Sequence, residues 1–240
     1  RLDTLPFAAV VLRRLLRLTQ ARRVVFSGNG LREGWYARHL SGSVRAEDPV
    51  IAAGMDLFRR FSRSEDLPPA LIDWTAPLFP DETPPLRRLR EAACWVGDIG
   101  AHEHPEYKAE QAFLRLLRQP GVGLDHHTRA FLALTLALRH EADPSAPWLQ
   151  PARALLDAAS AKRAETLGVA LRLAFTLPGG TATLLGLTGL RLEPERLVLR
   201  LARRGRVFAG GSVWRRLERL PAPPAREPAP EIPPEEVAAA

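Results

Sequence analysis

The chain has 240 residues, and 46% of them are hydrophobic, which is enough for one large or two small domains with a real core. It contains no run of eighteen or more apolar residues, which excludes a membrane-spanning helix, and its single cysteine, Cys94, excludes an internal disulfide. The net charge is +7, with the basic excess in residues 1–47 and 151–220, and such a charge favours a polyanion, a nucleic acid or a membrane surface as partner.

The first forty residues read as a helix, a strand and a helix. Apolar positions at helical spacing predict an amphipathic helix over residues 6–19. The apolar run Arg23–Phe26 leads into a glycine turn, which predicts a short buried strand, and a second helix is expected over 31–40. Because one strand makes no sheet, we expect this α/β unit to end a domain that lies upstream.

From Asp48 onward the pattern becomes helical. Apolar periodicity, with prolines near several starts, predicts helices over 49–61, 69–77, 83–96, 105–118, 125–140, 147–160 and 161–175. The period then changes to two, which predicts a hairpin, with a third short strand at 207–208 and a last helix over 212–220. The predicted fold class is therefore mainly α, with a small α/β element at each end. Residues 221–240, rich in proline, alanine and glutamate, are expected to form a disordered tail.

The order of several short motifs resembles the exopolyphosphatase/guanosine pentaphosphate phosphatase family. Ser27–Gly34 resembles the SxxGLREG signature of that family, and Ala92–Gly100 looks like a helix of its degenerate HD-type domain. His104–Ala109 and Gly123–Ala133 resemble two helices that follow in the family. The matches run in family order over about residues 1–220.

The resemblance implies a division into parts. Residues 1–47 would close the second actin-like ATPase-fold domain, 48–160 would form the HD-like helical domain, and 161–220 would form a small α+β subdomain before the tail of 221–240. The family's phosphate loops and catalytic glutamate lie in its first actin-like domain. We therefore expect the catalytic residues upstream of Arg1, in a processed or truncated chain, and assign none here.

The resemblance also implies an activity and its partners. Family members release terminal phosphate from inorganic polyphosphate or from guanosine pentaphosphate, using Mg²⁺ that this chain is not expected to bind. A cytoplasmic homodimer is expected, and no membrane partner. Nucleic acid is not favoured, because the five tryptophans are scattered and form no base-stacking platform.

The first candidate anion site is the glycine turn with the helix start after it. Ser27, Gly28 and Gly30 would present free backbone N–H groups to a phosphate, and Arg32 and Glu33 would point two ways from the helix. The alternative is that the glycines only permit close packing of strand and helix.

The second candidate anion site is a basic turn that contains Arg203, Arg204 and Arg206. Several arginines together would hold the distal part of a long polyphosphate, as phosphate contacts dominate nucleic-acid affinity. The alternative is an ordinary solvated turn.

The degenerate HD position is not expected to hold a metal. Gly97 stands where the histidine paired with Asp98 would be, although several histidines follow: His102, His104, His126 and His127. We expect Asp98 and His104 to cap or cross-link helices instead.

These observations leave more than one functional class open. The leading hypothesis is the C-terminal part of a phosphoanhydride hydrolase, supplying cleft wall, polyanion binding and dimer contacts. The alternatives are a non-catalytic basic module that binds polyphosphate or nucleic acid, and a purely structural dimerisation domain.

Overall fold

The computed structural model describes residues 2–61, 66–177, 181–193, 196–202, 210–220 and 227–231. The chain divides by its internal contacts into two units, residues 1–45 and 46–240. Across the described ranges, no helix combines the length and the apolar character needed to cross a bilayer.

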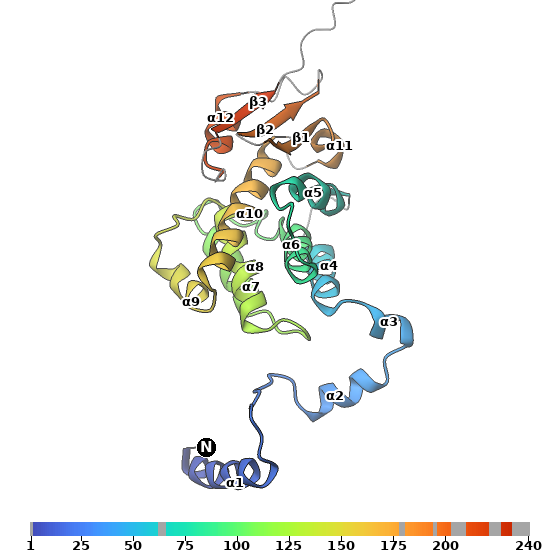
Figure 1. Ribbon diagram of the computed structural model, residues 1–240, viewed down its shortest axis with the longest axis vertical. Helices are drawn as coiled ribbons and strands as arrows, with labels where there is room; N and C mark the ends of the chain where they lie inside the picture. The colour runs from blue at the N-terminus through green and yellow to red at the C-terminus, as the bar shows by residue number, and fades with distance from the viewer. Residues whose placement is uncertain are drawn as a thin grey trace, which may run out of the picture. The chain divides into compact units, whose positions relative to one another are not determined.

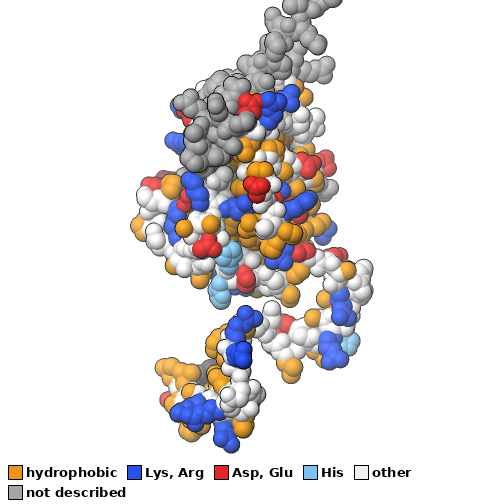
Figure 2. Space-filling view, in the orientation of Figure 1, with side chains coloured by type: hydrophobic (Ala, Val, Ile, Leu, Met, Phe, Trp, Pro, Cys, Tyr) orange, Lys and Arg blue, Asp and Glu red, His pale blue; other side chains and the backbone are white. Residues whose placement is uncertain are grey.

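The first unit is helical, and the strand predicted within it is absent. It contains the 3-10 turn η1 (Leu2–Thr4), then α1 (Leu5–Thr19) and α2 (Leu31–Arg38), and α3 (Gly42–Ala46) follows at its end. Val24, Val25 and Phe26 form no strand and are 41%, 72% and 85% exposed. The prediction of a buried strand is therefore wrong for this chain, because no described segment pairs with it. Figure 2 shows apolar side chains beside arginines on the surface of α1.

The second unit begins with a helical body built around one buried helix. Its elements are α4 (Pro49–Phe61), α5 (Leu67–Thr75), η2 (Ala76–Leu78), α6 (Pro84–Val96), α7 (Lys108–Leu117), α8 (His126–Arg139), η3 (Pro147–Leu149), α9 (Gln150–Arg153) and α10 (Ala158–Thr176). Helix α8 contacts α6, α7, α9 and α10, as Figure 1 shows for α7 and α10. Because neighbours cover it on several sides, α8 is buried continuously from Ala130 to Leu138.

Aspartates set the starts of the two longest helices of this body. The Asp125 carboxylate accepts the Thr128 N–H at 2.7 Å, and α8 begins at His126, directly after this aspartate. Asp157 accepts the Ser160 N–H at 2.7 Å in the same way, so residues 158–160 begin α10. The predicted helix over 147–160 is therefore wrong, because this cap starts a new helix before residue 160.

The C-terminal part of the second unit is a small sheet with short helices. It contains α11 (Ala182–Leu185), β1 (Thr188–Leu192), β2 (Arg196–Leu201), α12 (Gly211–Leu217) and β3 (Glu227–Glu231). The predicted hairpin is confirmed, with β1 and β2 antiparallel and Leu190 opposite Leu199. Figure 1 shows α10 running from the helical body up to this sheet.

The sheet also corrects one expectation about the tail. Residues 227–231 form β3, which pairs parallel with β2 at the end of the order β1-β2-β3. They were predicted to be disordered because the segment 221–240 is dominated by proline, alanine and glutamate and has no periodicity. Pro228 and Pro230 are two residues apart, so their backbone nitrogens lie on the same side of the strand. Both nitrogens, which carry no hydrogen, can therefore face the outer edge of the sheet, where no partner strand needs a donor. The third strand predicted at 207–208 lies outside the described residues.

Candidate functional site

The glycine turn of the first unit is closed by its own side chains. Ser27 Oγ accepts the Asn29 N–H at 3.0 Å, and the Glu33 carboxylate accepts the Gly30 N–H at 2.7 Å. Glu33 thus lies at the start of α2, where an anion would bind, and acts as a local cap.

The five residues of this first candidate are all exposed. They are Ser27, Gly28, Gly30, Arg32 and Glu33. A Cβ added at Gly28 would meet nothing within 4 Å, so no packing in this unit requires that glycine. A role of the turn in substrate binding stays a prediction.

The second candidate is the basic turn at residues 203–206. Arg203, Arg204 and Arg206 lie outside the described residues. Their role in holding polyphosphate also stays a prediction.

At the degenerate HD position, Asp98 is paired with an arginine. Asp98 Oδ1 lies 3.6 Å from Arg139 Nη2, and both residues are buried. The Arg139 guanidinium also lies over the ring of Phe175, 4.0 Å from its centroid. Asp98, two residues after α6, thus links the end of that helix to Arg139 at the end of α8.

The histidines near this position do not converge on Asp98. His104 is exposed, and its Nδ1 accepts the Glu106 N–H at 3.3 Å, while His127 hydrogen-bonds Ser160 at 3.1 Å. His102 and His126 are exposed. Among the residues that the structure describes, no group of three or more His, Cys, Asp or Glu side chains could hold a metal ion. That Mg²⁺ belongs to the intact enzyme and is not bound by this chain stays a prediction.

A buried histidine that the sequence did not single out lies beside this ion pair. His140 Nε2 is 2.6 Å from the carbonyl oxygen of Ile99, and Nδ1 is 2.7 Å from Arg139 Nη1. A carbonyl only accepts and a guanidinium only donates, so Nε2 carries the proton and Nδ1 accepts. Burial, and then the charge of Arg139, lower the pKa of His140 to about 3. The ring is therefore neutral.

Gly100 makes room for this histidine. It has φ of +89°, and a Cβ there would lie 3.1 Å from both His140 Nε2 and Ala112 Cβ. Any larger residue would be strained and would push the ring away from Ile99. The glycine ends the Ala92–Gly100 motif noticed in the sequence, but the histidine that it makes room for lies forty residues further on.

Next to His140 lies a strongly basic pocket made of two cavities. The first, of about 250 Å³, is lined by residues of α8, α10 and α12, and by Lys108 at the start of α7. The second, of about 290 Å³, shares Glu141, Arg172 and Arg216 with the first. We call the two cavities the basic pocket, and its charged lining residues are Lys108, Arg139, Glu141, Arg172, Arg215, Arg216 and Arg219.

Glu141 links the helices that surround the basic pocket. Its Oε1 lies 2.7 Å from Arg172 Nη2 and 2.9 Å from Arg216 Nη2, which joins the end of α8 to α10 and α12. Burial alone would raise the pKa of Glu141, but the hydrogen bond from Arg216 and the charge of Arg172 outweigh burial and lower it. The carboxylate is therefore ionised at neutral pH.

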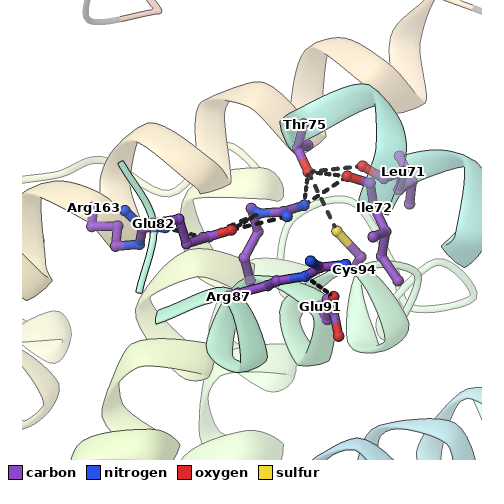
Figure 3. Close-up of polar contacts among 9 residues, drawn as sticks. Leu71, Ile72, Thr75, Glu82, Arg87, Glu91, Cys94 and Arg163 are labelled. Atoms are coloured by element: carbon purple, nitrogen blue, oxygen red, sulfur yellow. Dashed lines mark hydrogen bonds and ion pairs between the residues drawn. The ribbon is translucent and has the colours of Figure 1, made fainter. Parts of the chain in front are cut away.

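A second charged cluster of this unit is structural. Arg90 lies 3.0 Å from Glu82 Oε2 and donates to Ile72 O at 2.6 Å and to Thr75 Oγ1 at 3.1 Å. Arg163 of α10 donates to the same glutamate, as Figure 3 shows. Because Arg90 joins α6 to Ile72 and Thr75 of α5, and Arg163 of α10 contacts the same glutamate as Arg90, the cluster ties α5, α6 and α10 together.

The basic pocket was missed from sequence, although part of its signal was present. The excess of positive charge in residues 151–220 includes Arg172, Arg215, Arg216 and Arg219, but we assigned that excess to the turn at 203–206. Nothing local marks Arg172, which stands on a long helix among apolar residues.

Comparison with known proteins places this chain in a family. The family model described as exopolyphosphatase, C-terminal, matches residues 50–220, which is more than half of the chain and covers both the helical body and the hairpin. No curated protein matches the chain. The resemblance noticed in the motifs is confirmed, and the chain belongs to the exopolyphosphatase C-terminal family.

Proposed function

We propose that this chain is the C-terminal part of a phosphoanhydride hydrolase that releases terminal phosphate from inorganic polyphosphate or guanosine pentaphosphate. In this proposal the catalytic carboxylate and the Mg²⁺ belong to the actin-like part of the enzyme. The chain itself supplies polyanion binding, part of the cleft wall and the contacts of a cytoplasmic homodimer. The observation that carries the proposal is the family match over residues 50–220.

The charge of the basic pocket supports a role in binding polyanions. Arginine presents a planar fork of donors that matches phosphate oxygens. Arg172 and Arg216 are partly buried, with 15% and 23% of their side chains exposed, so their charges are less screened than those of a free surface. A chain of phosphates lying across the pocket would meet several such donors.

The test is to separate binding from hydrolysis in the purified 240-residue protein. Long-chain polyphosphate is expected to bind, with an affinity that falls steeply as salt is raised, because phosphate contacts release counterions. The same protein is expected to release no phosphate above a blank. Absence of polyphosphate binding at low ionic strength would contradict the binding role. Release of phosphate would contradict the assignment of catalysis to the actin-like part.

Gel filtration with light scattering tests whether the chain supplies dimer contacts. A mass of two chains supports the dimer contacts, and a monomer contradicts them. Dimerisation without polyphosphate binding would favour the alternative, a structural dimerisation domain. Binding by this chain, with no gain in hydrolysis when it is joined to the actin-like part, would favour a non-catalytic binding module.

A further inference from the structure

The two cavities of the basic pocket meet at a single carboxylate. Glu141, Arg172 and Arg216 line both cavities, and one oxygen of Glu141 contacts both guanidinium groups. The glutamate side chain is 47% exposed, whereas the two arginines lie deeper. A solvent-facing anion thus lies between two deeper cations, which is where an incoming phosphate group would bind.

The charges around this carboxylate are unbalanced. Arg139 pairs with Asp98, and Lys108 also lines a third cavity that contains Glu106, Glu110 and Glu141 itself, so we count neither cation toward the excess. The cations that remain are Arg172, Arg215, Arg216 and Arg219. Glu141 is the one acidic residue that lines either cavity of the basic pocket, as far as the described residues show.

The backbone at Glu141 is a second, independent observation. Glu141 follows the last turn of α8 with φ of +74°, in the left-handed region that favours glycine. Its N–H donates to Leu138 O at 3.2 Å, and the Ala142 N–H donates to Ala137 O at 3.0 Å, which is the hydrogen bonding of a Schellman motif. A non-glycine residue in this conformation carries strain. The backbone alone would therefore favour glycine at position 141, but the residue there is a glutamate.

We propose that Glu141 is a built-in competitor of the anion, which occupies the phosphate position between Arg172 and Arg216 until a phosphate group displaces it. This inference rests on the proposed function, since it assumes that the ligand of the basic pocket is a phosphate chain. Glu141 then lowers the affinity for short anions. A longer polyphosphate, which also reaches Arg215 and Arg219, displaces the carboxylate more readily than orthophosphate does.

The experiment measures binding of tripolyphosphate and orthophosphate by calorimetry to the 240-residue protein and its variants, at low ionic strength. Glu141→Gln removes the charge and keeps the shape of the side chain. Glu141→Gly removes the carboxylate and places the favoured residue at that backbone conformation. Glu165→Gln is the matched control, because Glu165 forms a similar partly buried pair with Arg153, at 2.6 Å, and lines neither cavity.

Both Glu141 variants are expected to bind tripolyphosphate about tenfold more tightly than the wild type, since a charge-assisted competitor has been removed. Glu165→Gln raises the net charge by the same amount as the Glu141 variants, but its affinity for tripolyphosphate is expected to stay within about twofold of the wild type. Arg216→Gln, introduced together with Glu141→Gln, should abolish the gain. Orthophosphate is expected to bind more tightly as well, because any anion in this position has to displace the carboxylate, and a gain for tripolyphosphate alone would contradict a competitor at the phosphate position.

Equal affinities of the Glu141 and Glu165 variants would overturn the inference, while polyphosphate binding by the wild type would leave the proposed function standing. If the wild type fails to bind polyphosphate but the Glu141 variants bind tripolyphosphate, the inference stands and the proposed binding role fails. Circular dichroism checks folding, and the glycine variant decides the test if the glutamine variant is unfolded. Loss of folded structure in both would make Glu141 a structural link and overturn the proposal.

Discussion

Gly168 of α10 lies so close to Thr135 of α8 that a Cβ added to the glycine would be 2.6 Å from the Thr135 carbonyl oxygen. The same Cβ would be 2.9 Å from Leu138 Cβ. Neither contact involves the flexible end of a side chain, so the helices would have to move apart. This close approach sets the position of α10, which carries Arg172, relative to the end of α8, which carries Arg139.

Replacing Gly168 by alanine is therefore expected to destabilise the protein despite the better helix propensity of alanine. Because the Cβ would lie only 2.6 Å from a backbone oxygen, the overpacking cost should reach the upper end of about 1–3 kcal/mol, and after a propensity gain of up to about 1 kcal/mol the net loss is about 2 kcal/mol. Urea denaturation measures this loss. Gly189→Ala is the control, because a Cβ there meets nothing within 4 Å. A stabilised Gly168→Ala protein would show that the two helices can separate without cost.

Glu82 neutralises two arginines in the core, so its removal should be costly. Arg90 is 3% exposed, and Arg163 is 15% exposed at its side chain. Glu82→Gln leaves both guanidinium groups buried without their carboxylate, and we expect a loss of about 3–5 kcal/mol in the free energy of unfolding.

The control for Glu82 is an exposed pair on α6. Arg87 and Glu91 are 2.7 Å apart at helical spacing, with Arg87 largely in solvent. Glu91→Gln should leave the denaturation midpoint where it is in the wild type. Similar midpoints for the Glu82 and Glu91 variants would mean that the buried cluster contributes no more than a surface pair.

His140 should make stability depend on pH. Its pKa of about 3 in the folded protein lies below the ordinary value of 6.5, so the unfolded chain binds a proton that the folded protein does not. The contribution of neutral His140 to the free energy of unfolding is therefore fully present above pH 6.5 and is lost as pH falls from 6.5 toward about 3. The slope from this residue approaches about 1.4 kcal/mol per pH unit.

The measurement is the free energy of unfolding between pH 7 and pH 5, in the wild type and in His140→Gln. Glutamine can still donate to Ile99 O but does not titrate, so the variant's curve should be flatter over that range. Parallel curves would show that His140 does not keep its neutral form in the folded protein.

The apolar run Val24–Phe26 should be unprotected in this chain. Its residues are exposed and form no strand, so their amides have no cooperative structure to shield them. Hydrogen exchange followed by mass spectrometry is expected to give near random-coil rates there and slow exchange in α8. Protection of the run comparable to that of α8 would show that it pairs with another segment in solution.

Much of the secondary structure was determined by the sequence alone. Apolar spacing and helix-start residues predicted α4 at its observed bounds and α6 and α8 within a residue or two. These signals are readable because helical hydrogen bonds and caps connect residues only three or four positions apart. The hairpin was readable for the same reason, since its alternation and turn lie within a dozen residues.

Only the tertiary structure decided what the charged and apolar side chains meet. Glu141 and Arg216 are 75 positions apart, and the helix packing that joins them depends on crossings such as that at Gly168. Val24–Phe26 has the composition of a buried strand but lies exposed, because a strand requires a neighbour that its own sequence does not supply. The sequence thus determined most of the long helices and that the chain is basic. The packing of α8, α10 and α12 decided where the cations converge, because that depends on how distant helices are rotated and spaced.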